Sequence, residues 1–493
     1  MEYEKILEQN NDQMIEALQA VLRFCSEQAE PVTTAEGEVY PFGQGVQDAF
    51  ESVLALGHQM GFETFDADHY GGHIEWKGTG KPVLNENGEV QRYEEPRVMA
   101  ILGHLDVVPA AGGWTFDPYG GEVRDGIIYG RGTTDDKGPV ISCLFAMKAL
   151  KDAGFVPQDT IRLILGLDEE TGWVGMDHYF SQVEKPDYGI TPDADFPLVN
   201  GEKGIMVFEF AKNFSKSQVK GLELRSLKGG TAANSVPDAC RAVIRNQKDA
   251  DYSQIKEMAA SFREKTGYKL YAKGIGKSLE LTAAGVNAHG AQPHLGLNAI
   301  SVMMQFLGKL NFVSDDQNDF IAFYNDYIGF NLNGEKLGID FEDQKSGKLV
   351  FNVGIAEMDP EAGKLTINVR YPVTMTAEPV YEGFSEVLEK YNFGLVKIKD
   401  QPPIFKDTDS PMVKLLVDIY RKHTGDYETE PMVIGGGTYA RAADNILAYG
   451  AAFPGDPDLM HQKDECLSVE RLKQMTKIYA EAIYKLTSSD YNI

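Results

Sequence analysis

Histidine and acidic residues recur in this sequence where apolar stretches end or a helix is about to begin. They are His104 and Asp106 in ILGHLDVVPA, Asp135 and Asp136 in GRGTTDDKG, Glu169 and Glu170 in LGLDEETG, Asp193 in GITPDADFP, and His461 in PDLMHQKDE. Carboxylates gathered in one cleft repel one another and raise each other's pKa, and bound divalent cations relieve that repulsion. Two cations that share a carboxylate, about 3.5–4 Å apart, also activate a water for hydrolysis. The pattern therefore favours a two-metal hydrolytic site.

Each motif has a plainer interpretation when it is taken alone. Aspartates such as those of DDKG commonly cap helices. The DEE run is typical of a solvated strand end, PD is typical of a turn, and a histidine at a strand end usually makes a structural hydrogen bond. Their joint order along one chain favours the metal site over these interpretations. Mixed histidine and carboxylate ligands suit zinc, and also manganese or cobalt.

The elements that would carry these residues alternate between helix and strand. Apolar periodicity predicts helices over residues 1–30 and 45–60. A buried strand is expected in RVMAILGHLDVV, a helix over 139–154, and a second buried strand over 160–170. Strand, helix and strand in this order predict a βαβ unit and a parallel sheet. Such sheets bind ligands beyond the carboxyl ends of their strands, where these motifs lie.

The pattern changes near residue 203. Segments such as LVFNVGIAEMDPEAGKLTINVRYPV alternate like antiparallel strands, with helices between them, and the prolines of DQPPIF mark a return. We predict an α/β catalytic domain with a largely parallel, helix-flanked mixed sheet, formed by residues 1–202 and 403–493. An α+β lid domain, residues 203–402, would be inserted between its halves.

Composition excludes several classes of partner. The 493 residues include 74 acidic and 47 basic ones, and the net charge of −27 argues against nucleic acid or an anionic membrane surface. No apolar run approaches the length of a membrane span. The four cysteines are dispersed, so neither a disulfide framework nor a cysteine–zinc site is expected. The segment MEYEKILEQNNDQ does not resemble a signal peptide. We expect a cytoplasmic protein.

The motifs together resemble a known family. GHLDVVP, GRGTTDDKG, DEETGW, TPDADFP, NAHGAQPHLGLNAI, INVRYP, GGGTYAR and MHQKDE match, in order, the co-catalytic metallopeptidases that include aminoacylase, carboxypeptidase G, acetylornithine deacetylase and succinyl-diaminopimelate desuccinylase. Within that family the sequence is most similar to the PepV-type bacterial dipeptidases. No single motif is specific, but the combination is, and it covers nearly the whole chain.

The resemblance implies a role for each residue of the metal site. His104 and Asp193 would hold one metal ion, Glu170 and His461 a second, and Asp135 would bridge the two. The peptide bond after Asp135 would be cis. Two divalent ions per chain are implied, with zinc favoured and manganese or cobalt as alternatives.

The catalytic roles also follow from the resemblance. Glu169 would be the general base, which takes a proton from the attacking water and passes it to the leaving amine. Asp106 would hydrogen-bond the second ring nitrogen of His104 and fix its tautomer. His289, from the inserted domain, would help to stabilise the oxyanion; taken alone, it is a turn histidine.

The substrate contacts are implied in the same way. Asn234 in TAANSVP and Arg370 in INVRYP match lid residues that contact substrate, and an arginine fork suits a carboxylate. Gly435, Gly436, Gly437 and Thr438 resemble a loop whose backbone N–H groups receive the substrate's C-terminal carboxylate. Taken alone, Arg370 is an outward strand residue and GGGT a flexible turn without the lysine of a phosphate loop.

The large inserted domain resembles the PepV type, in which extra lid structure occupies the place of a partner chain. We therefore expect a monomer that hydrolyses unbranched dipeptides with a free N-terminus. Two alternatives stay open within the family, an N-acyl amino acid deacylase and a carboxypeptidase. A catalytically inactive metal- or peptide-binding relative is an alternative of another class, and a protein whose acidic residues all lie on the surface is a further one.

Overall fold

The chain forms two compact units in a computed structural model that describes residues 2–87, 89–216, 219–249 and 251–488. The first unit contains Met1–Asn200, Lys406–Met432 and Thr438–Ile493. The second contains Gly201–Phe405 and Val433–Gly437. Each unit has its own apolar core.

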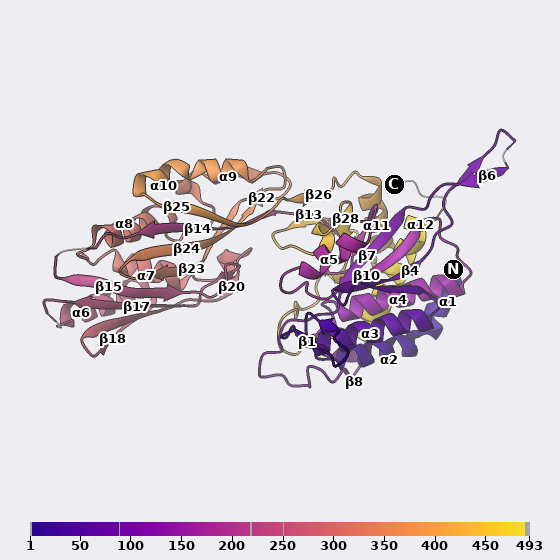
Figure 1. Cartoon of the computed structure of the whole chain (residues 1–493), viewed down its shortest axis with the longest axis horizontal. Helices are drawn as coiled ribbons and strands as arrows, with labels where there is room; N and C mark the ends of the chain where they lie inside the picture. Colours follow the sequence, from indigo (N-terminus) through magenta and orange to yellow (C-terminus); the bar gives the residue numbers. More distant parts are fainter. Residues whose placement is uncertain (1, 88, 217–218, 250, 489–493) are drawn as a thin grey trace. The chain divides into compact units, whose positions relative to one another are not determined.

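The first unit is built on a mixed sheet whose central strands are parallel (Figure 1). Six of its strands follow one another in the order β28 (Ile446–Ala448), β11 (Tyr188–Thr191), β7 (Val98–His104), β10 (Thr160–Gly166), β4 (Gly71–Trp76) and β3 (Glu63–Asp66). The strands from β28 to β10 run parallel, and β4 and β3 are antiparallel to their neighbours. Nearly every residue of β7 and β10 is buried, as expected for parallel strands covered on both faces.

Seven α-helices surround this sheet in the described part of the first unit. They are α1 (Glu2–Gln9), α2 (Asn11–Leu22), α3 (Gln44–Gln59), α4 (Lys137–Asp152), α5 (Val174–Gln182), α11 (Pro411–Thr424) and α12 (Val469–Thr487). Helices α4 and α12 pack against each other and on β10, and α4 also contacts β7. The sequence β7, α4, β10 confirms the predicted βαβ unit.

The single helix predicted over residues 1–30 is wrong. Helix α1 ends at Gln9, where two asparagines of low helix propensity follow, and α2 ends at Leu22. The next residues bond instead to the segment after β7, because the Ser26 hydroxyl donates to the Leu105 carbonyl and the Val107 N–H donates to the Ser26 carbonyl.

The second unit is an antiparallel sheet with helices packed on it. The strand order is β18 (Lys269–Ile275), β19 (Ser278–Ala284), β17 (Ala239–Asn246), β15 (Leu222–Gly229), β23 (Val350–Met358), β24 (Ala362–Tyr371), β14 (Gly204–Asn213) and β25 (Gly394–Gln401). The helices are α6 (Ser253–Thr266), α7 (Ala299–Leu307), α8 (Asp315–Phe323), α9 (Glu378–Gly383) and α10 (Ser385–Tyr391). Burial alternates along β14 and β17, which is the pattern of strands with one covered face.

Short strands complete both units. In the first unit β8 (Glu122–Arg124), β9 (Ile127–Tyr129) and β30 (Cys466–Ser468) form a small sheet, and the remaining pairs include β5 (Pro82–Leu84) with β6 (Val90–Tyr93). In the second unit β16 (Ser235–Val236) pairs with β20 (Ala288–His289). The fold is thus an α/β domain with an inserted α+β unit, as predicted.

One assignment along the chain differs from the prediction. Val433–Gly437, expected in the catalytic domain, belongs to the second unit. The Lys203 N–H donates to the Ile434 carbonyl at 3.0 Å, and a Cβ built on Gly435 would lie 3.0 Å from Cβ of Ala291. Backbone pairing and close packing therefore hold this loop to the second unit.

Within the described ranges, no helix is both long and apolar enough to cross a bilayer. The four cysteines, all of them described, are free thiols.

Candidate metal centre

The carboxyl ends of three adjacent parallel strands carry most of the predicted site. His104 is the last residue of β7, and it lies in register with Gly166, the last residue of β10. Glu169 and Glu170 follow β10 directly, and Asp193 follows β11 by two residues. Strand ends that meet at one edge therefore bring together residues that are distant in sequence.

Two groups of three side chains have the composition and spacing to hold metal ions. One group is His104, Glu169 and Asp193, and the other is Asp135, Glu170 and His461. Within each group the ligand atoms all lie within 4.8 Å of one another. These are the five predicted ligands together with the predicted base.

Asp135 lies between the two imidazoles. Its Oδ1 is 2.9 Å from Nε2 of His104, and its Oδ2 is 2.9 Å from Nε2 of His461. Nε2 of His461 is also 3.0 Å from Oε1 of Glu170, and Nε2 of His104 is 3.7 Å from Oδ2 of Asp193. The peptide bond between Asp135 and Asp136 is cis, which confirms the expectation taken from the resemblance.

The contacts of Asp106 differ in part from the prediction. The closest partner of His104 Nδ1 is the backbone carbonyl of Asp106, at 2.9 Å, and the carboxylate is 3.4 Å away. That carboxylate accepts hydrogen bonds from the backbone N–H groups of Glu169, at 3.1 Å, and Glu170, at 3.0 Å. Asp106 therefore orients the imidazole mainly through its main chain, while its carboxylate fixes the turn after β10.

Burial and mutual repulsion dominate the electrostatics of the acidic groups. Burial, with the charge of Asp135, raises the pKa of Asp193 to about 7. Burial and the charge of Asp193 raise the pKa of Glu169 well above its usual range. Burial likewise raises the pKa of Glu170, with Asp135 adding to the shift. These three carboxylates are thus buried close together, and their mutual repulsion adds to the cost of burying them.

For the two histidines and the shared aspartate, mutual hydrogen bonds shift the pKa toward the charged form of each group. Hydrogen bonds with Asp135 and Glu170 raise the pKa of His461 to about 11. Burial would lower the pKa of His104, but contacts with Asp106 and Asp135 raise it well above the usual value. Burial works to raise the pKa of Asp135, yet the two imidazoles hold it below its ordinary range.

These residues fit a pair of divalent cations. His104 is fully buried, and its Nε2 makes no hydrogen bond of good geometry among the described residues, although it faces carboxylate oxygens. An imidazole nitrogen aimed at a cluster of carboxylates is the donor set of zinc, and equally of manganese or cobalt.

An aromatic pair behind the turn after β10 was not singled out from the sequence. The indole N–H of Trp173 donates to the Glu169 carbonyl at 2.8 Å, and its ring packs on Tyr439, with ring centroids 5.2 Å apart. Tyr439 in turn meets the His104 ring edge-on at 6.2 Å. Trp173 lies in the motif DEETGW and Tyr439 in GGGTYAR. Neither side chain is typical of a metal site, so only their packing in the structure shows that they support the turn after β10 and the His104 ring.

The predicted substrate contacts lie in the second unit, except Thr438, which lies in the first. Asn234 and His289 are neighbours, because Ser235 pairs with His289 between β16 and β20 and the Gly290 N–H donates to the Asn234 carbonyl. Arg370 is on β24, and its Nε donates to Oδ1 of Asn368 at 3.0 Å. Arg370 is buried and paired with a polar neighbour, unlike the outward strand residue of the alternative interpretation.

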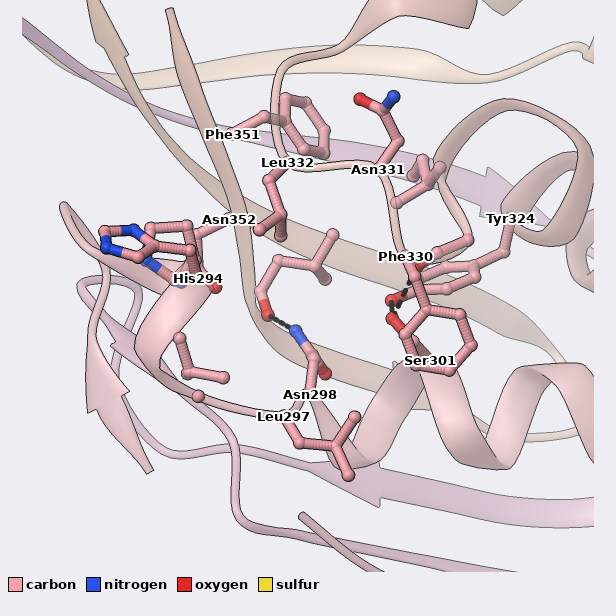
Figure 2. A pocket seen from close by; sticks show the side chains of 16 residues that line it. His294, Leu297, Asn298, Ser301, Tyr324, Phe330, Asn331, Leu332, Phe351 and Asn352 are labelled. Carbon is pink, nitrogen blue, oxygen red and sulfur yellow. Dashed lines mark hydrogen bonds between the residues drawn. The ribbon is translucent and has the colours of Figure 1, made fainter. Parts of the chain in front are cut away.

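A cavity of about 220 Å³ lies within the second unit, and Figure 2 shows the side chains that line it. Its lining has no acidic side chain and no cysteine, and His294 is its single histidine, so it has none of the character of the metal centre. Asn352 forms part of its wall and donates to the carbonyls of Ala233 and Ser235, at 3.1 and 2.9 Å. The cavity wall therefore supports the segment that carries Asn234.

Comparison with known proteins assigns the chain to a family. The model of Peptidase family M20/M25/M40 matches residues 100–485, a segment that includes every residue of the metal centre. The chain belongs to this peptidase family. The match confirms the resemblance inferred from the motifs.

Two bacterial proteins are similar to this chain over almost its whole length. A Bacillus subtilis protein named "Putative dipeptidase YtjP" is 36% identical over 489 residues, which are 99% of this chain and 100% of that protein. A Staphylococcus epidermidis protein named "Putative dipeptidase" is 38% identical over 491 residues, 99% of each chain.

Solved structures share the M20 fold. An M20 family metallo-carboxypeptidase from Sulfolobus solfataricus aligns with a TM-score of 0.53 at 16% identity, over 96% of this chain and 98% of that chain. Human carnosine dipeptidase 1 aligns with a TM-score of 0.51 at 15% identity, over 98% of each chain. At these identities the likeness is one of fold alone.

Proposed function

We propose that this chain is a metal-dependent dipeptidase that hydrolyses unbranched dipeptides with a free N-terminus. The observation that carries the proposal is the pair of three-residue groups joined by Asp135, one of which contains Glu169. Membership of a peptidase family supports hydrolysis of a peptide bond, and the names of the two bacterial relatives support the choice of dipeptides.

The ligands divide around the shared aspartate. His104 and Asp193 would hold one cation, Glu170 and His461 the other, and Asp135 both. When bound, the two divalent ions, with zinc favoured over manganese or cobalt, would polarise the scissile carbonyl and acidify a water molecule. This assignment leaves Glu169 free of a ligand role, although it lies within the first group.

Glu169 is the general base of the proposed reaction. Its carboxylate takes a proton from the attacking water and delivers it to the leaving amine, so that water and the peptide become a carboxylic acid and an amine. The main chain of this residue is held at both ends, since Asp106 accepts from its N–H and Trp173 donates to its carbonyl. A base whose main chain is fixed in this way samples few orientations that are unproductive for proton transfer.

The second unit, together with Thr438 of the first, would supply the remaining contacts. His289 would donate to the oxyanion of the tetrahedral intermediate. Asn234 and Arg370 would contact the substrate, and the guanidinium fork of Arg370 is well suited to a carboxylate. The backbone N–H groups of Gly435–Thr438 would receive the substrate's C-terminal carboxylate. Recognition of both substrate ends would exclude longer peptides.

The proposal is tested with metal-stripped protein. A panel of dipeptides, a tripeptide and N-acetyl amino acids is incubated with added zinc, manganese or cobalt, and the released amino acids are quantified. We expect cleavage that is restored by metal and confined to dipeptides, and the most effective ion identifies the productive metal.

Other outcomes point to the alternatives. Cleavage of N-acetyl amino acids alone would keep the metal site but indicate a deacylase, and release of C-terminal residues from longer peptides would indicate a carboxypeptidase. Metal binding without any cleavage would favour the inactive relative. Absence of both binding and cleavage would overturn the metal site itself.

A further inference from the structure

A buried ion pair lies behind the loop that carries Asp135 and has no part in the proposed chemistry. Nη1 of Arg131 is 2.7 Å from Oε2 of Glu465, and the two side chains are 2% and 1% exposed. Burying an ion pair is costly unless further hydrogen bonds satisfy it, so its remaining partners indicate what it stabilises.

Those partners belong to the Asp135 loop. Oε1 of Glu465 accepts the backbone N–H groups of Gly132 at 3.1 Å, Thr134 at 3.0 Å and Asp135 at 3.4 Å. The Thr133 hydroxyl lies 3.4 Å from the same oxygen. One carboxylate oxygen is thus contacted by four consecutive residues that end at the shared aspartate, three through a backbone N–H and Thr133 through its hydroxyl.

Glu465 is also the anchor of the loop that carries His461, four residues earlier. The His461 side chain is 51% exposed, whereas Glu465 is buried at the point where this loop joins β30. The Gly130 N–H donates to the Glu465 carbonyl at 3.0 Å, and Cys466 pairs with Tyr129 between β30 and β9. The main chain and side chain of Glu465 therefore join two loops that are distant in sequence.

We propose that Glu465 is a positioning residue for the metal centre. By fixing the Asp135 loop to the base of the His461 loop, its carboxylate sets the spacing between two ligands and so raises metal affinity. Groups that hold metal ligands in place commonly contribute in this way. The inference rests on the proposed metal site and deepens it.

Glu465→Gln tests this role with minimal change of shape. The hydrogen-bond partners of the carboxylate described above all act as donors. The NH₂ group of a glutamine would therefore face another donor, either the backbone N–H groups or Arg131. We expect metal affinity to fall about 10- to 100-fold, measured by titration against a chromophoric chelator on protein shown to be folded by circular dichroism. Activity should decline at limiting metal and recover when metal is in excess, with KM little changed.

Glu481→Gln is the matched control. Glu481 is also buried and ion-paired, but its partners are Lys422 and His423, away from the metal centre. We expect this variant to lose stability and to keep the metal affinity of the wild type. If Glu465→Gln does not fold, Arg131→Lys keeps the carboxylate and the positive charge while removing the fork, and a smaller loss of affinity is expected.

The results separate this inference from the proposed function. A wild-type chain that binds no divalent metal would overturn the metal site. Wild-type affinity in folded Glu465→Gln or in Arg131→Lys would overturn the positioning role and leave the metal site intact. Equal weakening in Glu481→Gln would also overturn it, because the effect would then reflect stability alone.

Discussion

At the scale of single residues, neighbouring carboxylates in this chain have different tasks because their main-chain contacts differ. The Asp106 carboxylate accepts hydrogen bonds from two backbone N–H groups. Asp135 lies between two imidazoles. The Glu465 carboxylate accepts hydrogen bonds from the loop that carries Asp135. Glu169 is held through its main chain, which is compatible with the proposed role of its carboxylate as the base. Chemistry is thus divided among acids of the same type by position.

Glu169→Gln tests that division. The amide keeps the size of the side chain but cannot accept the proton, so we expect kcat to fall about 10²- to 10⁴-fold while metal content and KM stay near wild type. Steady-state kinetics with the best dipeptide and metal analysis by mass spectrometry provide the measurement. Glu63→Gln, at a surface pair with Lys77, is the control. Substantial activity in Glu169→Gln would show that another group is the base.

At the scale of elements, the site depends on how closely the strand ends approach the residues behind them. Gly166 ends β10 where a Cβ atom would come within 2.3 Å of the Tyr439 ring. That ring lies against His104 and Trp173, so the same contact supports both the end of β7 and the turn that follows β10.

Gly166→Ala is therefore expected to be costly. The added methyl forces Tyr439 or the strand to move, and overpacking of this kind destabilises by about 1–3 kcal/mol. Urea unfolding measures the loss, and kcat should fall as well because the turn carrying Glu169 shifts. Gly112→Ala, at a position with no atom within 4 Å of the added Cβ, should change neither. Unchanged stability in Gly166→Ala would show that the ring adjusts freely.

Helices α11 and α12 are joined by a charge cluster with a defined pH dependence. Hydrogen bonds from His423 and Lys422 lower the pKa of Glu481 to about 2, from an ordinary value of 4.5. As pH falls below 4.5 the unfolded chain takes up this proton first, so the stabilisation is complete above 4.5 and is lost toward pH 2.

Glu481→Gln should remove that dependence. We expect lower stability than wild type at pH 7 and a smaller further loss between pH 4.5 and 2, measured by denaturant unfolding across that range. Glu8→Gln, at an exposed pair with Lys477, serves for comparison. Parallel curves for Glu481→Gln and wild type would contradict the assignment.

At the scale of the whole molecule, the two units have separate cores, and the candidate ligands found among the described residues all lie in the first unit. A ligand that binds the native state stabilises it by about 2.7 kcal/mol at 100 times its Kd. We therefore expect calorimetry to show two unfolding transitions. The midpoint temperature of one of them should rise when metal is added and fall when a chelator removes it. An equal shift of both transitions would contradict independent units.

The oligomeric state is a second prediction at this scale. The inserted unit resembles the PepV type, so we expect a monomer that completes its own site. Light scattering should give a mass near 54.5 kDa, calculated from the sequence. A mass near twice that value would require a partner chain in the account of the oxyanion contact.

Much of the architecture could be predicted from the sequence because it depends on local patterns. Apolar runs with strand and helix periods indicated β7, α4 and β10, and the order of the motifs indicated the family and the cluster of ligands at the strand ends. Such signals are visible because each is written in consecutive residues.

Contacts between segments distant in sequence were decided only by the tertiary structure. The carboxylate of Asp106 meets the main chain of Glu169 and Glu170, Val433–Gly437 joins the second unit, and Glu465 joins the loops of Asp135 and His461. The end of α2 also depends on a distant partner, since the residues that follow α2 bond to the segment after β7. Backbone N–H groups have the same chemistry in nearly every residue. No sequence pattern therefore indicates which distant N–H group will donate a hydrogen bond to a buried carboxylate.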